Sequence, residues 1–478
     1  MKLTQTLIFI FLLANSLAGQ DNIGIAGSSH APANTVLINP SSIVDSRVFL
    51  DFNLIGIGAF VRNDLVYIPG KQISMKGLSA LTEVPVNRKN DPYAAYADVI
   101  VQGPSLVFAV KKHSFGFHTA ARVSADVRGI PKAMGYYITD GIQYPGAMGV
   151  QQQVKNLRAN ALGWGELGLS YGTILKSDGD AIWQGGITAK RLLGVAGVGL
   201  RLDDWSYVVS DSTHLETSVF RGEYGFNDPS ASASMINGKG WGFDLGMTYK
   251  VRKSNSEGYV PHDPCTDGDY RYKIGFSILD IGRIKFIGPF YRNVFDQSES
   301  AQWEEYAGSE ADDAAGLDSL FNSNFNLVEQ NGNEKKFNMK LPTALSAQFD
   351  YNFGHNIYVM GIATIGLPRK NSLGIQRASY IGVVPRFEIK RLEFSMPLSL
   401  YEWKNPQMGF AVRANSIIIG SDNLAALLFK KNVYGADIYF NLKYTIFKNW
   451  KCKTKKEKPA PIRKKLIKTA LPCPDWEK

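Results

Sequence analysis

The stretch KGWGFDLGMTYKV, residues 239–251, decides the fold because two kinds of side chain alternate along it. One row holds Trp241, Phe243, Leu245, Met247 and Tyr249, and the opposite row holds Gly242, Asp244, Gly246, Thr248 and Lys250. Successive side chains of a β-strand point to opposite faces of its sheet. The stretch therefore predicts a strand with an apolar environment on one face and a polar environment on the other.

The same period of two returns later in the chain, at residues 392–400 and 434–446. Two folds produce it: a closed barrel with its apolar face in lipid, and a two-sheet sandwich with its polar face in water. The barrel is favoured because strand follows strand, because the strands reach the length of about 9–11 residues that spans a bilayer, and because aromatic residues cluster near their ends. The candidate strands number roughly 14 to 17, depending on how they are merged, and single-chain bacterial barrels have even strand numbers. We predict an all-β fold, a transmembrane antiparallel barrel of about 14 strands covering residues 47–447.

The N-terminus carries the features of an export signal. Lys2 precedes an apolar run at residues 7–13, and small residues at 16–18 form a cleavage motif. This pattern predicts a secretory signal peptide over residues 1–19. After it, the chain contains no apolar run of about 20 residues, which a spanning helix requires.

Charge is unevenly distributed along the chain, whose net charge is +10. Residues 448–478 hold 11 basic and 3 acidic side chains, whereas residues 293–337 hold 10 acidic and 2 basic ones. Such segregation predicts two different locations. We expect residues 448–478 to be a disordered basic extension in the periplasm and residues 293–337 to be an acidic extracellular loop. The pairing of Cys452 with Cys473 in that extension stays open.

Connection lengths suggest the orientation of the barrel, since barrels of this kind have short periplasmic turns and longer outer loops. Short turns are expected at residues 112–114, 353–356 and 401–406. Long connections are expected at residues 124–160, 211–239, 254–269 and 293–340. The long connections are therefore predicted to lie outside the cell.

Two short segments resemble the FadL-type family of outer-membrane proteins. They are LINPSSIVD at residues 37–45, just before the first strand, and IGFSILDIG at residues 274–282. The resemblance is strongest to relatives in Bacteroidota, which include PorV-like subunits of the type 9 secretion machinery and uncharacterised barrels. It implies a 14-stranded barrel with an N-terminal hatch at residues 20–46, in which Asn39 and Pro40 form the turn that leads to the first strand.

The resemblance implies two alternative functions. Fatty-acid transporters of the family bind and pass small hydrophobic molecules, whereas PorV-like members are partners of secreted proteins and transport nothing. The first is the leading hypothesis, with outer-membrane lipid and a hydrophobic ligand as partners. The second would use the basic extension to contact a periplasmic or secretion-system protein. The extension is not expected to bind nucleic acid, because the chain is exported.

Charged residues in the polar rows of the strands are expected to face the lumen. They are Arg122, Asp244, Glu393, Arg413 and Lys443. Two roles stay open for them: an ionic ladder that stabilises the barrel, or the lining of a polar path.

Catalytic and metal-binding motifs are weak in this sequence, and no cofactor is expected. The six histidines lack the spacing of a helical zinc site. Ser105 and His118 face the lumen on neighbouring predicted strands, but any barrel of this size offers such a pair. Asp263, Asp267 and Asp269 lack the terminal glutamate of a calcium loop. We therefore predict that the chain is not an enzyme.

Overall fold

The computed structural model describes residues 22–44, 46–72, 85–88, 92–110, 112–140, 148–211, 214–227, 234–253, 270–287, 290–297, 301–304, 327–330, 337–368 and 372–447. The predicted signal peptide and the basic extension lie outside these residues, as does the loop that contains Asp263. No helix in this part of the chain is both long and apolar enough to cross a bilayer.

Nearly all regular structure is antiparallel β-sheet. The strands are β1 (Val48–Asn63), β2 (Tyr93–Gln102), β3 (Ser105–Val110), β4 (His113–Ile130), β5 (Gln151–Asp178), β6 (Ala181–Val209), β7 (His214–Asn227), β8 (Gly238–Arg252), β9 (Tyr270–Phe286), β10 (Phe290–Gln297), β11 (Ala301–Glu304), β12 (Leu327–Gln330), β13 (Phe337–Lys340), β14 (Ala344–Gly354), β15 (Ile357–Gly366), β16 (Tyr380–Glu388), β17 (Leu392–Ser395), β18 (Leu398–Tyr401), β19 (Asn405–Met408), β20 (Phe410–Ala414), β21 (Ile417–Ser421) and β22 (Gly435–Phe447). The helices are η1 (Ile23–Ile25), α2 (Pro32–Thr35), η2 (Pro40–Ile43), η3 (Gly70–Gln72), α4 (Lys132–Asp140) and α6 (Ala425–Leu428).

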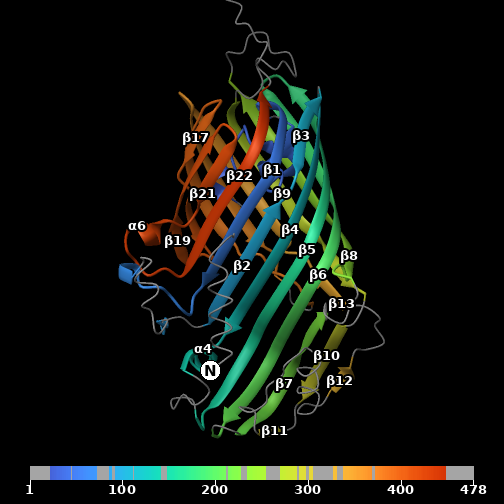
Figure 1. Cartoon of the computed structure of the whole chain (residues 1–478), viewed down its shortest axis with the longest axis vertical. Coiled ribbons are helices and arrows are strands. Elements are labelled where there is room, and N and C mark those ends of the chain that lie inside the picture. The colour runs from blue at the N-terminus through green and yellow to red at the C-terminus, as the bar shows by residue number, and fades with distance from the viewer. Residues whose placement is uncertain are drawn as a thin grey trace, which may run out of the picture.

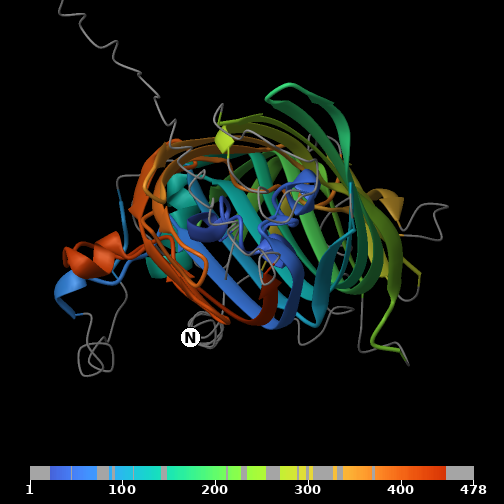
Figure 2. The same ribbon diagram turned by 90° about the horizontal axis from the view of Figure 1, so that it is seen from above.

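The strand segments combine into a closed barrel of 14 strands, as predicted. Short breaks divide several strands, so that β2 and β3, for example, both lie between β1 and β4. β7 and β8 likewise pair with successive parts of β6. The first strand, β1, pairs with the last strand, β22, which closes the ring. Figures 1 and 2 show this ring from the side and from above.

The outer surface of the barrel is an apolar belt. β8 shows the alternation: Trp241, Phe243, Leu245 and Met247 are all more than 40% exposed, whereas Asp244 and Lys250 are buried. Neighbouring strands continue the belt, for example through Leu169 of β5 and Phe276 of β9. Since water disfavours so large an apolar surface, the belt is the lipid-facing surface of a transmembrane barrel.

The two ends of the barrel differ. At one end, which we call the tight-turn end, two-residue turns join β3 to β4, β5 to β6, β14 to β15 and β20 to β21. The first and last strands also begin and end there, because Val48 pairs with Phe447. At the other end, the long-loop end, longer connections follow β1 and β4. Barrels in outer membranes place their longer loops outside.

The wall is much taller on one side. β5 has 28 residues and β6 has 29, about three times the length that spans a bilayer. At the long-loop end, residues 198–209 of β6 pair with β7, and β7 in turn pairs with β10 and β11. We call β7, β10 and β11, with residues 151–162 of β5 and 198–209 of β6, the wing; it extends beyond the rest of the ring in Figure 1.

The wing corrects two expectations, both of them about connections. The expected connection at 211–239 contains the strand β7, and the one at 293–340 contains parts of β10 and all of β11, β12 and β13. These segments extend the sheet because β7 pairs with the long strand β6, β10 and β11 pair with β7, and β12 pairs with β10.

The expectation that every long connection lies at one end of the barrel and every short turn at the other is also wrong in two places. The connection at residues 254–269 joins the end of β8 to the start of β9, which both lie at the tight-turn end, opposite the other long connections. Conversely, the short turn within residues 401–406 joins β18 to β19 at the long-loop end. Neighbouring strands run in opposite directions around the closed ring, so successive connections alternate between the two ends. This alternation, and not the length of a connection, decides the end at which it lies.

Candidate functional site: the hatch, the charged lumen and the apolar cluster of the wing

The segment before β1 occupies the lumen. Its helices η1, α2 and η2 lie inside the ring of strands, in blue in Figure 2. Most of its side chains are buried, including Ile25, Ala31 and Ile43. We call residues 22–44 and 46 the hatch.

The hatch turn at Asn39 and Pro40 is fixed by its own side chain and by the wall. The Asn39 Oδ1 atom accepts hydrogen bonds from the Ser41 amide (3.0 Å) and the Ser41 hydroxyl (2.7 Å). Its Nδ2 atom donates to Gln348 Oε1 of β14 at 3.0 Å. Pro40 stands at the first position of η2, where its missing N–H costs nothing.

The wall is thinned by glycines where this turn approaches. A Cβ atom added at Gly186 of β6 would lie 2.4 Å from the Pro40 carbonyl carbon, and one at Gly246 of β8 would lie 2.1 Å from Asn39 Oδ1. A Cβ atom at Gly172 of β5 would collide with Val44. The small residues in the polar rows therefore serve close approach of the hatch backbone.

Four carboxylates of the wall and rim hold the hatch. Asp422 accepts from the amides of Ile23 (2.7 Å) and Gly24 (3.1 Å), and Glu393 from the Ser28 hydroxyl (2.7 Å). Glu388 accepts from the Ser29 amide (3.0 Å) and contacts His30 Nδ1 at 2.6 Å. Asp51 accepts from the Ala33 amide at 3.1 Å. These bonds satisfy hatch donors that water cannot reach.

Two groups in these contacts, His30 and Asp422, lie outside the spanning strands and have shifted pKa values. Burial lowers the pKa of His30, against the opposing effect of its hydrogen bond to Glu388. Burial raises the pKa of Asp422 to about 6, although its hydrogen bonds from the Ile23 and Gly24 amides act in the opposite direction. The two shifts have opposite consequences for stability against pH.

The five charged residues proposed for the lumen are buried and lie in two groups. In the first group, Arg122 donates to both oxygens of Asp280 at 3.1 Å, and Asp244 lies 2.7 Å from Lys190 Nζ. In the second group, Arg413 Nε donates to Glu393 at 2.9 Å. Lys443 Nζ lies 3.0 Å from both Asp51 Oδ2 and the His30 carbonyl oxygen. Each of the five has an ionic partner, which is the arrangement of a ladder.

Sequence reasoning missed the residue that joins most of the first group, Asp280. Its carboxylate also accepts from Lys190 Nζ at 2.7 Å and lies 3.5 Å from Arg377. Asp280 has a positive φ of 54°, and the pairing register between β8 and β9 shifts beside it. This β-bulge turns the carboxylate inward. The sequence carries a signal for this bulge. The outward-facing apolar residues stand at even positions at Phe276 and Ile278 and at an odd position at Ile281.

A second missed cluster surrounds Arg386, whose side chain is fully buried. Its guanidinium donates to Asp350 at 2.9 and 2.8 Å, to Glu388 at 3.0 Å and to the Tyr270 hydroxyl at 2.9 Å. Since Glu388 also binds the hatch, this cluster links three wall strands to it.

Two small cavities border the hatch in the described part of the chain. A cavity of about 70 Å³ lies between the hatch and the wall near Gln348 and Asp350, and one of about 50 Å³ adjoins Arg122 and Asp280. Each has room for a few water molecules and no more. Neither of these two cavities is large enough for a hydrophobic ligand.

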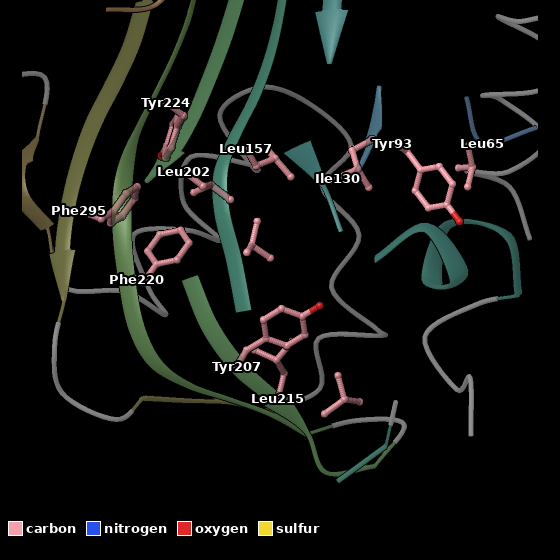
Figure 3. Close-up of a cluster of buried hydrophobic side chains, with 12 residues drawn as sticks. Leu65, Tyr93, Ile130, Leu157, Leu202, Tyr207, Leu215, Phe220, Tyr224 and Phe295 are labelled. Atoms are coloured by element: carbon pink, nitrogen blue, oxygen red, sulfur yellow. The ribbon is translucent and has the colours of Figure 1, made fainter. Parts of the chain in front are cut away.

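The inner side of the wing is apolar. Buried side chains from β5, β6, β7 and β10 pack with Leu65, Tyr93 and Ile130 from the facing segments. The members supplied by the wing are Val154, Leu157, Leu202, Tyr207, Val209, Leu215, Phe220, Tyr224 and Phe295. Figure 3 shows these side chains gathered beside the ribbons, and we call the set the wing cluster.

Aromatic contacts order the wing cluster. The rings of Trp205 and Tyr207 are stacked with centroids 4.4 Å apart, and Phe220 meets Phe295 edge-on at 5.1 Å. The wing stands beyond the lipid belt, and the members of the cluster are buried against one another.

Ser105 and His118, the pair considered for catalysis, have other partners in the structure. Ser105 Oγ donates to the Gly103 carbonyl oxygen at 3.0 Å rather than to His118, whose Nε2 lies 3.4 Å from Glu166. The described residues contain no group of three metal-binding side chains.

Fold and site together define a transmembrane β-barrel whose lumen is filled by an N-terminal hatch. Residues 40–422 match the model of a family described as a family of unknown function (DUF5723), and the chain belongs to this family. No curated protein matches it.

Solved structures similar to the chain include the toluene transporter TodX of Pseudomonas putida, with 10% identity, coverage of 90% of this chain and 98% of that one, and a TM-score of 0.38. The toluene transporter TbuX of Ralstonia pickettii has 10% identity, 87% and 93% coverage, and a TM-score of 0.39. A FadL homologue of Pseudomonas aeruginosa has 8% identity, 90% and 98% coverage, and a TM-score of 0.32. Likeness at this level carries no argument about ligands.

Proposed function

We propose that the protein is an outer-membrane barrel that binds small hydrophobic molecules at the wing cluster and passes them toward the membrane. The observation that carries the proposal is the position of this cluster. It places an apolar inner surface beyond the lipid belt, at the end with the longer loops. Its side chains are buried against one another, and an apolar ligand would bind by taking the place of some of these contacts.

The lumen below the cluster supports binding more strongly than free flow. The two cavities described between the hatch and the wall are too small for such a ligand, so a ligand held at the wing needs a wider path than they offer. Passage then requires the hatch or the wall to move. A closed barrel with a binding site above its hatch acts as a gated carrier rather than an open pore.

The test is uptake of a labelled fatty acid by liposomes that contain the purified full-length protein. Uptake faster than into empty liposomes is expected. Replacing Leu157 and Leu202 by asparagine should weaken binding by about tenfold per lost leucine contact. The matched control replaces Val150, an exposed residue at the long-loop end, by asparagine. Equal rates for protein-containing and empty liposomes would remove the proposal.

The second candidate is a partner in a secretion or surface complex that transports nothing. It is favoured by the number of bonds between the hatch and the wall, which fix the hatch as a structural plug. Pull-down from detergent extracts, with and without residues 448–478, tests it. Loss of a specific partner on removal of the extension, together with no uptake activity, would support this second function over the first.

A further inference from the structure

Two loops at the long-loop end form a small projection on the outside of the barrel. One loop follows β1 and contains η3, and the other joins β21 to β22 and contains α6. Residues 66–72 and 423–434 make up this projection, which we call the rim lobe. Figure 2 shows α6 outside the ring of strands, and Figure 1 shows it on the side opposite the wing.

Backbone hydrogen bonds and side-chain packing hold the two loops of the rim lobe together. Ile68 and Val433 exchange two backbone hydrogen bonds of 3.0 and 2.9 Å. The rings of Tyr67 and Tyr434 pack with centroids 5.3 Å apart. A Cβ atom at Gly70 would lie 2.2 Å from the Lys430 carbonyl group, so the first loop packs directly against the backbone that carries the lysines.

The outer face of the rim lobe combines bare apolar side chains with lysines. Leu428, at the end of α6, is 66% exposed, and Phe429, which follows it, is 63% exposed. Lys430 and Lys431 follow directly and are exposed, and Lys430 has a positive φ of 50° that turns the chain sharply after Phe429. Lys71 of η3 is exposed as well.

A separate turn repeats this combination at the same rim. Trp403 and Lys404 lie between β18 and β19, and Trp403 is 53% exposed. α6 contacts β19, so this turn and the rim lobe are neighbours. Tryptophan and lysine beside each other are typical of the interface between hydrocarbon and headgroups.

The rim lobe continues the lipid belt. Ile419 of β21 and Ile438 of β22 lie on the strands that enter and leave it, and both are at least half exposed on the outer face. The short wall ends here, so the lobe stands at the boundary where hydrocarbon gives way to headgroups. Leu428 and Phe429 suit the hydrocarbon side, and the lysines suit negatively charged headgroups.

We propose that the rim lobe is a binding site for a phosphate-bearing membrane lipid, whose acyl chains contact Leu428 and Phe429 and whose phosphate is bound by Lys430 and Lys431. The proposal rests on the transmembrane placement of the barrel in the proposed function. The two fail separately, because lipid binding at the rim needs no hydrophobic cargo at the wing.

The experiment titrates the full-length protein in detergent with phosphatidylglycerol and reads the Kd of bound lipid by native mass spectrometry. Replacing Lys430 and Lys431 together by glutamine should raise the Kd by about fivefold per lysine at low salt. The matched control removes two positive charges from the wing, Lys155→Gln with Arg221→Gln, and should leave the Kd within about twofold. Equal effects of the two double variants would overturn the proposal.

Two further arms separate lipid from a free anion. Leu428→Ser with Phe429→Ser should raise the Kd for phosphatidylglycerol and for phosphatidylcholine, because both lipids use the apolar contact. Glycerol phosphate, which has the headgroup charge without acyl chains, should fail to displace the lipid. Displacement by glycerol phosphate, or unchanged lipid affinity in the serine variant, would overturn the role of the lobe as a lipid site.

Discussion

Replacing Lys443 by methionine should release the hatch from the wall. Lys443 Nζ is fully buried and lies 3.0 Å from both Asp51 Oδ2 and the His30 carbonyl oxygen. Asp51 also accepts from the Ala33 amide and, at 2.8 Å, from the Thr445 hydroxyl. The change therefore leaves a carboxylate in the lumen with only neutral donors.

The expected cost follows from the burial of the pair. Removing one partner of a buried ion pair costs about 3–5 kcal/mol, because the remaining charge stays desolvated. Removing both charges costs much less. The double variant Asp51→Asn with Lys443→Met should therefore recover most of the loss seen in Lys443→Met alone.

Hydrogen exchange of hatch peptides measures this loss where it occurs. The Ala33 amide, protected by Asp51, should exchange roughly 100 to 5,000 times faster in Lys443→Met. Lys176→Met is the control, since Lys176 pairs with Asp178 at 3.3 Å on the surface and should change little. Unchanged exchange at Ala33, or a double variant no better than the single one, would refute the view that this pair holds the hatch.

The pH dependence and the glycines of the wall give two further predictions. Because the pKa of Asp422 is raised to about 6 in the fold, its contribution to stability is present below the unfolded value near 3.8 and is lost as pH rises through about 6; Asp422→Asn should remove this slope from the thermal midpoint measured between pH 4 and 7. Identical pH profiles in wild type and Asp422→Asn would contradict the assignment of this slope to Asp422. The lowered pKa of His30 gives a slope of the opposite sign, so His30 does not account for it. Gly186→Ala should displace the hatch turn at Pro40 and speed hatch exchange, whereas Gly165→Ala, with no atom closer than 3.8 Å to its new Cβ, should not; equal exchange in both variants would count against close approach of the turn.

The barrel was predictable because the pattern that indicates a barrel strand lies within a single short stretch of sequence. Alternation along residues 239–251 requires only that one strand has two unlike faces, and β8 shows those faces. Adding such segments gave roughly 14 to 17 strands, and the even strand number of bacterial barrels led to the prediction of about 14. The wing was missed because β7 carries a weaker alternation and its pairing depends on the unusual length of β6.

The lumen was predictable only in part, for a physical reason. A polar row shows that Arg122 or Lys443 faces inward, but the identity of its partner depends on strands distant in sequence. Asp280 lies 158 residues from Arg122 and faces inward only through a bulge. The hatch contacts of Asp422 and Glu388 depend in the same way on closure of the ring.

The central claim is that the barrel keeps lipid outside and ions inside, and tryptophan fluorescence tests it directly. In single-tryptophan variants placed in vesicles of brominated lipid, Trp241 lies on the outer face and Trp164, whose ring is 4.8 Å from the Arg122 guanidinium carbon, faces the lumen. The account predicts strong quenching of Trp241 by the lipid and little quenching of Trp164. Quenching of Trp241 by aqueous iodide, with no effect of brominated lipid, would contradict it.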